Sequence, residues 1–473
     1  MTSSAQKSHP WVVVALLSTV QFMGVLDFAM VNIALPAMQQ ALGFSEQNLQ
    51  WIVSAYSLTW GGFLLLGGRA ADILGRRRVF MAGLGLFTIA SLIGGLAQFQ
   101  WVFITARAFQ GLGAAIMSPA ALSILTTTFG EGHKRNQAMG IWNAFASGGF
   151  AAGVLLGGIL IDNLGWQWVM FVNVPLGTAV FAFSPIVLSE SRAQTTTSQV
   201  DIAGAVTVTA GLMLLVYALV QAPEVGWITA STLLLFVGAL TFLTLFVWIE
   251  SQSLSPLIPL GIFRRRTLVA ANLVGALLHA VAVSMAFILT LYMQQILNYS
   301  ALQTGLALLP HALAESVMAP LASQLVNRWG VKTTLVAGMM LVMGGMVILT
   351  QISVRDNFIR DLLPGTVIAG LGIVTGLVSV TIAATAGINN SEQGLASGLL
   401  STCEQIGAAT GLAIVVAIST ARTKAIAANT DSSKVALQIA TTEGFQAALA
   451  VGAIFAAIGI LVTVMVQKRR QQS

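Results

Sequence analysis

Long apolar runs, each about as long as a membrane is thick, are the feature that most constrains this fold. A helix that crosses the hydrocarbon core of a bilayer needs about 20 largely apolar residues. The sequence holds fourteen such runs, and only 8% of its 473 residues are charged, whereas a soluble domain carries about a quarter. We therefore expect an all-α integral membrane protein with fourteen transmembrane helices.

The basic residues in the short loops indicate how these spans are oriented. Cytoplasmic loops carry an excess of Lys and Arg, and with both termini in the cytoplasm sixteen basic residues lie inside and five outside. The chain is therefore expected in the plasma membrane, multi-pass, with both termini cytoplasmic. The spans are expected at 11–35, 49–68, 79–98, 101–126, 137–161, 168–188, 201–221, 228–249, 268–293, 304–325, 333–351, 364–387, 394–420 and 444–467.

Two repeated patterns indicate an internal duplication. Asn327 follows Asp72 by 255 residues in loops with matching small and basic residues, and the glycine series that starts at Gly140 recurs from Gly398, 258 residues later. The two motifs agree on nearly one offset, which spans eight helices. Helices 1–6 and 9–14 are therefore expected to form two halves.

This offset also predicts the domain organisation. We expect an N-terminal six-helix bundle over 1–190, two inserted transmembrane helices over 191–252 and a C-terminal six-helix bundle over 253–473. Duplicated bundles of this kind place a substrate site near the midplane, between halves that expose it to each side in turn. A transporter is the leading class.

The loop after the second span reads GRAADILGRRR from Gly68 to Arg78. Its glycines permit close backbone approach, and a carboxylate such as Asp72 can cap a helix N-terminus or pair with a cation. The stretch resembles the signature loop of the major facilitator superfamily, which acts as a cytoplasmic latch. The resemblance implies a gating role for Gly68, Asp72, Gly75 and Arg76; the alternative is a simple positive-inside anchor.

The fourth span contains a charged residue, Arg107, in the stretch RAFQGLG. An arginine at midspan costs at least about 2.5 kcal/mol on insertion scales, so it normally faces a cavity or a partner. The stretch resembles the intramembrane arginine motif of the same superfamily, which implies a role in proton handling. A structural clamp on backbone carbonyls is the alternative.

The fifth span carries the glycine series Gly149, Gly153, Gly157 and Gly158. This series resembles the antiporter motif of the exporting branches, although Val154 stands where that pattern has proline and the helix loses a cause of kinking. The small-residue face still allows tight helix contact, and generic packing is the alternative interpretation.

Three further stretches resemble the fourteen-helix drug:proton antiporter branch. LDFAMVNIALP begins at Leu26, with Ala29 where the branch pattern has threonine, WQWVMFVNVP begins at Trp166, and GLALLP begins at Gly305. The resemblance covers nearly the whole chain. It implies a major facilitator fold of two six-helix bundles plus two inserted helices, and a multidrug efflux transporter that confers antibiotic resistance.

Only three of the sixteen acidic residues fall well within spans: Asp27, Glu315 and Glu404. Such residues are functional candidates by default, because a carboxylate in a low-dielectric cavity can hold either a proton or a cation. With Arg107 they form the expected coupling site, and we expect electrostatic coupling between Asp27 and Arg107.

Histidines supply the remaining candidates. His311 stands four residues before Glu315 and therefore shares its helical face, so the pair can pass or share a proton; a local hydrogen-bonded pair is the alternative. Glu404 takes the place of Ala146 in the repeat, which favours a function over packing. His279 shows no partner in the sequence and is expected to be a satisfied packing histidine.

Aromatic residues near these charges can offer flat surfaces to a lipophilic cation through cation–π contacts. Interhelical or lipid-facing packing is the alternative for each. The possible substrate contacts are Phe28, Tyr56, Trp60, Trp142 and Phe145.

These observations favour a proton-coupled antiporter that exports drugs or other toxic, cationic lipophilic compounds from the cytoplasm by alternating access. The alternatives are a dedicated exporter of an endogenous metabolite, siderophore or lipid, and an uptake symporter. No catalytic constellation or Walker-type loop is apparent, so we expect no enzyme activity, no metal and no cofactor, with the proton as coupling ion. The expected partners are substrate, protons and membrane lipid, with no nucleic acid, and the protein is expected to be a monomer.

Overall fold

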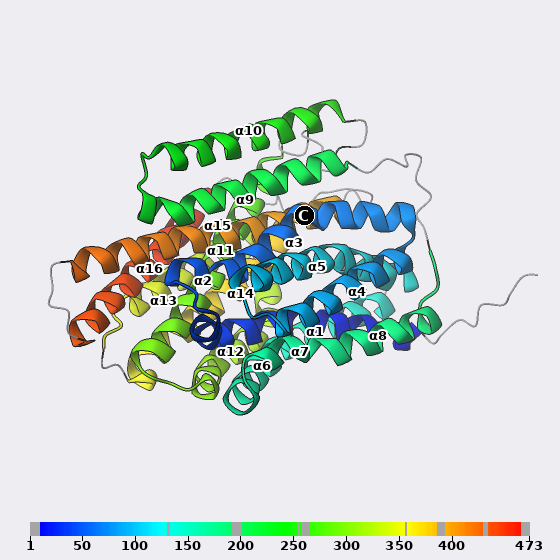
Figure 1. The fold of residues 1–473 in the computed structure, drawn as a ribbon. Helices are drawn as coiled ribbons and strands as arrows, with labels where there is room; N and C mark the ends of the chain where they lie inside the picture. Colours follow the sequence, from blue (N-terminus) through cyan, green and yellow to red (C-terminus); the bar gives the residue numbers. More distant parts are fainter. Residues whose placement is uncertain are drawn as a thin grey trace, which may run out of the picture.

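The computed structural model describes residues 10–129, 133–191, 201–253, 256, 261, 265–354, 357–385, 393–428 and 434–464. Every regular element in these ranges is a helix. Fourteen of the helical stretches are long and apolar enough to cross a membrane, which confirms the expected fold class. Figure 1 shows a bundle of long helices that run in roughly one direction.

The helices have the following bounds. The first half contains α1 (Pro10–Leu42), α2 (Glu46–Leu49), α3 (Trp51–Leu74), α4 (Arg76–Gly95), α5 (Gln100–Thr128), α6 (His133–Leu164), α7 (Gln167–Phe171) and α8 (Asn173–Val187). Next come α9 (Ile202–Val225) and α10 (Ala230–Gln252). The second half contains α11 (Arg266–Leu291), η2 (Tyr292–Ile296), α12 (Ala301–Trp329), α13 (Val331–Leu349), η3 (Phe358–Leu362), α14 (Leu363–Thr385), α15 (Gln393–Ala427) and α16 (Lys434–Thr463).

The helical form follows from the solvent. A bilayer core offers no water to unpaired backbone groups, so a spanning segment must satisfy them internally. Many hydroxyl side chains in the spans also find their hydrogen-bond partner within their own helix. Ser91 Oγ donates to the carbonyl of Phe87 at 2.8 Å, and Ser184 Oγ donates to that of Val180 at 2.7 Å. Polar residues in the spans are thereby accommodated without water.

Glycines fix the distance between α1 and α6. A Cβ added at Gly149 would lie 2.7 Å from the carbonyl oxygen of Phe22, and one added at Gly153 would lie 2.8 Å from that of Leu26. Because such distances are too short for real Cβ atoms, the two helices pack this closely only with glycine at these positions.

The same contact recurs in the second half, between α15 and α11. A Cβ at Gly407 would collide with the backbone of Ala276, and one at Gly411 would collide with Ala280. Gly407 and Gly411 belong to the glycine series that repeats that of α6. The duplicated motif therefore makes an equivalent helix–helix contact in each half.

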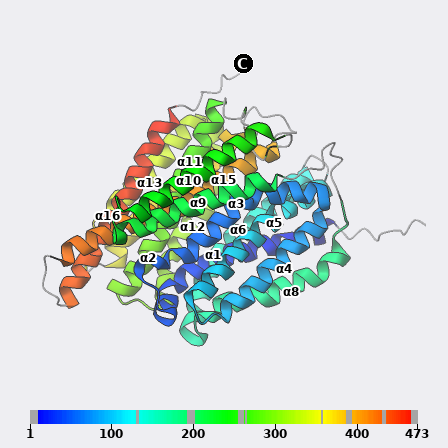
Figure 2. The same cartoon turned by 45° about the horizontal axis from the view of Figure 1, so that its top comes forward.

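Helices α9 and α10 form a pair on the outside of the bundle, with α9 next to α3 and α15 and α10 outermost (Figures 1 and 2). Leu212 and Val216 of α9 share a small apolar cluster with Leu58 of α3 and with Ala409 and Ala413 of α15. This pair of helices thus lies over the seam between the two halves. The exact division into 1–190, 191–252 and 253–473 stays a prediction.

The two halves meet where α1 and α6 end and α12 begins, which we call the Asp162 end. Asp162 Oδ2 of α6 accepts hydrogen bonds from Ser300 Oγ at 2.9 Å and from the backbone N–H of Leu302 at 3.2 Å. Beside them, Gly158 of α6 lies against the backbone of Leu302, and Gly305 of α12 lies against that of Val154. Of the predicted glycines, Gly158 therefore serves the contact between halves.

The end of α1 makes a second junction between the halves. Gln294 Nε2 of η2 donates to the carbonyl of Ile33 at 3.0 Å, and Gln295 Nε2 donates to Gln39 Oε1 at 2.8 Å. Polar bonds therefore join the two halves at the Asp162 end.

Candidate coupling site

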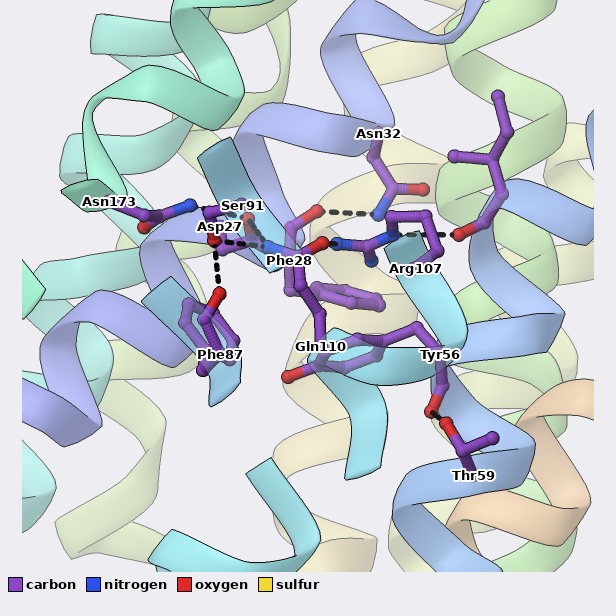
Figure 3. A network of polar contacts seen from close by, with 11 residues as sticks. Asp27, Phe28, Asn32, Tyr56, Thr59, Phe87, Ser91, Arg107, Gln110 and Asn173 are labelled. Carbon is purple, nitrogen blue, oxygen red and sulfur yellow. Dashed lines mark hydrogen bonds and ion pairs between the residues drawn. The ribbon is translucent and has the colours of Figure 1, made fainter. Parts of the chain in front are cut away.

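Asp27 of α1 and Arg107 of α5 form a buried ion pair inside the first half. Arg107 Nη1 donates to Asp27 Oδ2 at 2.7 Å, and the two side chains are 1% and 0% exposed. Each charge lies in an apolar helix, where it is costly without a partner. The expected coupling of the two residues is confirmed as a direct contact, drawn in Figure 3.

Neutral amides complete the surroundings of the Asp27 carboxylate. Asn173 Nδ2, at the start of α8, donates to Oδ1 at 2.7 Å, and Gln110 Nε2 donates to the same oxygen at 3.4 Å. Gln110 also accepts from Arg107 Nη1 at 2.8 Å and donates to Ser91 Oγ of α4 at 2.7 Å. Helices α5 and α8 thus bond the carboxylate of α1 directly, and α4 holds Gln110 through Ser91 (Figure 3).

Arg107 is held in two further ways. Its Nε donates to the backbone carbonyl of Ile52 at 2.9 Å, and its guanidinium carbon lies 4.4 Å from the centre of the Tyr56 ring. Arg107 therefore makes the backbone contact expected of a structural clamp and also pairs with an acid, while its role in proton handling stays a prediction.

The five aromatic candidates differ in accessibility. Tyr56 is buried, with one ring face against Arg107 and with Trp60 packed against it at 5.5 Å between centroids. Trp142 is buried as well, whereas Phe145 is 38% exposed and Phe28 is partly exposed. In this conformation Tyr56 already holds an internal cation. Substrate contact stays a prediction for all five residues.

In the second half, His311 and Glu315 lie side by side on α12. His311 Nε2 is 3.4 Å from Glu315 Oε1, as expected from their spacing. The other ring nitrogen, Nδ1, is 3.0 Å from the carbonyl oxygen of Thr366 on α14. A backbone contact therefore fixes the orientation of this imidazole.

The prediction that His279 is a satisfied packing histidine is wrong. Its Nδ1 lies 3.9 Å from Glu404 Oε1, and that nitrogen is buried without a hydrogen bond. The sequence hid this partner because Glu404 lies on α15, far along the chain. The His279 and Glu404 side chains are 24% and 15% exposed, so both are partly accessible within their spans.

The candidate gating loop packs within the first half. Gly75 has φ 111° between α3 and α4, a conformation that favours glycine. The Glu190 carboxylate beside it accepts a hydrogen bond from the backbone N–H of Arg77 at 3.2 Å, and the backbone N–H of Arg76 donates to the carbonyl of Ser191 at 3.0 Å. Gly68 lies near Pro119. The Asp72 side chain lies outside the described part of the chain, and the gating role stays a prediction.

Sequence reasoning missed Gln110, Asn173 and Ser91. Neutral polar residues are common in membrane spans, so their presence in the sequence does not by itself indicate a functional site. Two signals point to them afterwards: Gln110 follows Arg107 by three residues, on the same helical face, and Asn173 lies in the WQWVMFVNVP stretch that carries the family resemblance.

The arrangement consists of carboxylates with a guanidinium or an imidazole beside each of them. Within the described residues, no three His, Cys, Asp or Glu side chains lie together as a metal would need. The first half offers one carboxylate that is sealed and paired with a guanidinium. The second half offers two carboxylates that are partly accessible, each with an imidazole beside it.

Comparisons with known proteins agree with this architecture. The puromycin resistance protein pur8 of Streptomyces alboniger is 35% identical over 454 residues, which cover 95% of this chain and 89% of that protein. The cephamycin export protein CmcT of Amycolatopsis lactamdurans is 39% identical over 409 residues, which cover 85% of this chain and 84% of that protein.

The fold is also that of solved transporters. A bacterial homolog of the human lysosomal transporter Spinster, solved in an inward-facing and unoccupied conformation, matches with a TM-score of 0.67 and 14% identity, covering both chains in full. The family model described as Major Facilitator Superfamily matches residues 17–412 and, in a second match, 273–473. The chain is therefore a multi-pass membrane transporter that belongs to the major facilitator superfamily.

Proposed function

We propose that this transporter is a proton-coupled antiporter that exports drugs or other cationic lipophilic compounds from the cytoplasm by alternating access. The observation that carries the proposal is the set of acids within the spans: Asp27 sealed with Arg107, and Glu315 and Glu404 partly accessible. A resistance protein and an export protein among the relatives support drug export as the direction of transport.

Competition between a proton and a cation for one carboxylate is sufficient for antiport. A carboxylate that binds a cation gives up its proton, and one that takes a proton releases the cation. Alternating access then links each exchange to one side of the membrane. The coupling set is Asp27, Arg107, His311, Glu315 and Glu404.

The orientation assigns a state to this conformation. With both termini in the cytoplasm of a plasma-membrane protein, the Asp162 end faces outward. The bonds of Asp162 to Ser300 and Leu302 then join the halves on the external side, which supports a conformation closed to the outside.

Helix α1 is the element that connects coupling to gating. It carries Asp27, and six residues later the carbonyl of Ile33 accepts the bond from Gln294 of the other half. Protonation of Asp27 would remove the charge that holds Arg107, and a shift of α1 would carry this change to the external junction. In this proposal the proton is the coupling ion, and the transporting unit is a monomer without a cofactor.

The proposal is tested by puromycin and ethidium accumulation in cells that express the protein, with and without a protonophore. We expect low accumulation that rises to the empty-vector level when the protonophore is added. Asp27→Asn and Glu404→Gln should each raise accumulation of at least some cations at unchanged expression. Accumulation equal to that of empty-vector cells before protonophore addition, for every compound tried, would contradict the proposal.

A second candidate is a dedicated exporter of one endogenous natural product, favoured by the cephamycin export protein among the relatives. The two functions differ in breadth, because a dedicated site rejects compounds that fail to match its polar groups. Efflux of both puromycin and ethidium, which share little structure, favours drug export. Efflux of a single class favours the dedicated exporter.

A further inference from the structure

A groove of about 340 Å³ lies between α4 and α5, on the surface of the first half. Its most buried residues are small, since Ala90 and Ala106 are 2% and 3% exposed. Large apolar side chains stand beside these alanines and are exposed, among them Ile89, Trp101 and Phe109. Small residues flanked by large ones therefore hollow this face along the contact between the two helices.

The lining of the groove excludes a charged ligand. Of the nine side chains that line it, eight are aliphatic or aromatic, and the ninth is the neutral hydroxyl side chain of Thr105. An ion in such a place would lose its hydration without gaining a partner of opposite charge. The groove therefore fits a hydrocarbon.

The length and direction of the groove match one leaflet of a bilayer. On α5 it extends from Trp101 to Phe109, which is about 12 Å along a helix that rises 1.5 Å per residue. The hydrocarbon of one leaflet is roughly 15 Å deep, half of the core of about 30 Å. Trp101 is the second residue of α5, and tryptophan is typical of the level of the lipid headgroups. A chain that enters beside Trp101 therefore lies lengthwise in the groove.

We infer that this groove is a specific site for one acyl chain of a membrane phospholipid. Lipid chains surround these spans at high concentration, and their apolar chemistry, length and direction all fit the groove. A transported compound or a second copy of this protein would share the apolar chemistry but not the match to the depth of a leaflet. Such a site is independent of proton coupling, because it lies outside the coupling set.

The groove lies along the same helix contact that holds part of the polar network. Ala90 precedes Ser91 and Ala106 precedes Arg107 in the sequence. Ser91 of α4 accepts the hydrogen bond from Gln110 of α5 at 2.7 Å. A chain in the groove fills a hollow against this contact, so we expect it to stabilise the packing of α4 on α5.

The site is tested with phosphatidylcholine brominated on one acyl chain, because bromine quenches tryptophan fluorescence at short range. Purified protein in dodecyl maltoside is titrated with this lipid, and the signal of one tryptophan is the difference from a variant with phenylalanine in its place. Trp101 at the groove and Trp248 on α10 form a matched pair, since they are 69% and 61% exposed. We expect quenching of Trp101 to saturate at about one lipid per protein. Quenching of Trp248 should rise only in proportion to the lipid content of the micelle.

Two substitutions locate the bound chain. Thr105→Phe adds a ring to an exposed residue of the groove, so the protein should fold while the lipid that quenches Trp101 binds at least about tenfold more weakly. Thr241→Phe adds the same ring to an exposed threonine of α10 and should leave this binding unchanged. Unbrominated phosphatidylcholine should raise the unfolding temperature of the unchanged protein and of Thr241→Phe more than that of Thr105→Phe.

Four other results would overturn the inference. Parallel quenching of Trp101 and Trp248 would show general contact with lipid and no specific site. Saturable quenching of Trp101 that Thr105→Phe leaves unchanged would place the lipid outside the groove. Quenching that puromycin reverses would assign the groove to a transported compound, and quenching that falls as protein concentration rises in the same micelles would assign it to a second copy of the protein.

Discussion

At the scale of single residues, the acids within the spans of the two halves differ in burial and in their partners. Asp27 is sealed among Arg107, Gln110 and Asn173, whereas Glu404 is partly accessible beside an imidazole. A sealed ion pair is suited to sense the conformation, since any movement of α1 or α5 leaves a charge exposed to an apolar environment. An accessible acid is suited to exchange ligands.

Loss of one partner of the sealed pair is expected to destabilise the protein strongly. Arg107→Leu leaves the Asp27 charge buried and unpaired, which costs about 3–5 kcal/mol. The double variant Asp27→Asn with Arg107→Leu removes both charges and should recover most of that stability, while transport stays lost. Thermal unfolding of purified protein and ethidium efflux measure the two effects. Equal unfolding temperatures for the single and double variants would contradict the ion pair.

Asn173 is expected to position the Asp27 carboxylate. Asn173→Ala removes the 2.7 Å hydrogen bond to Oδ1, and loss of a bond to a charged group costs about 1.5–3 kcal/mol. The matched control is Asn163→Ala on α6, because Asn163 Nδ2 donates only to the carbonyl of Ile159 at an exposed site. Thermal unfolding should show a clear loss of stability for Asn173→Ala and almost none for Asn163→Ala. Equal losses of stability in the two variants would show that Asn173 does not position the carboxylate.

At the scale of helices, the glycine faces set how closely the elements pack. Each half carries such a face in equivalent places, on α6 against α1 and on α15 against α11. The faces are spaced by four residues, so they follow single stripes along their helices. The α6 face lies beside the segment of α1 that holds Asp27, which ties the packing of the helix to the coupling site.

The glycine face of α6 predicts a position-specific effect of one substitution. Gly153→Ala places a methyl group 2.8 Å from Ala29 Cβ and from the carbonyl oxygen of Leu26, and such overpacking costs about 1–3 kcal/mol. Gly148→Ala on the same helix meets nothing within 4 Å and should be tolerated. Folded yield and puromycin efflux of the two variants provide the test. Reduced yield and efflux in both variants, or in neither of them, would contradict the close contact at Gly153.

The Asp162 end predicts a shift in conformation. Asp162 caps the start of α12 from the other half of the molecule, and loss of a cap costs about 0.5–2 kcal/mol. Asp162→Ala should therefore favour the state open at this end roughly 2- to 30-fold. Asp201→Ala, which removes the cap that Asp201 provides to its own helix α9, should leave this equilibrium unchanged.

Distances between spin labels at Asn163 and Leu306, with the single Cys403 replaced by serine, report this equilibrium. A larger population of long distances is expected for Asp162→Ala. Identical distributions for Asp162→Ala and the unchanged protein would show that the carboxylate does not hold this end closed.

Sequence reasoning reached the helices and the charged residues for one physical reason: both contrast with an apolar background. Asp27, Arg107 and the fourteen spans are visible because lipid tolerates neither unpaired charge nor unpaired backbone. Gln110 and Asn173 are neutral and do not stand out from the apolar background. The partner of His279 could not be predicted, because it depends on how α11 packs against α15. The ring of Tyr56 is occupied by Arg107, which no local pattern could show.

At the scale of the whole molecule, the structure joins a coupling site to a junction between two halves. α9 lies across the seam between α3 and α15, where it contacts both halves. The sealed pair and the Asp162 end lie in different parts of the bundle, and the packing of α1 against α6 connects them. Under the proposed function, this connection would carry changes at the pair to the junction between the halves.

The central claim is that proton movement drives export, and everted membrane vesicles test it most directly. Vesicles that carry the protein are acidified inside by respiration, and an acridine dye reports the gradient. We predict that ethidium or puromycin collapses part of the gradient in these vesicles and not in vesicles with Asp27→Asn. Export that continues unchanged after the gradient is abolished, or a gradient that no transported compound disturbs, would contradict the account.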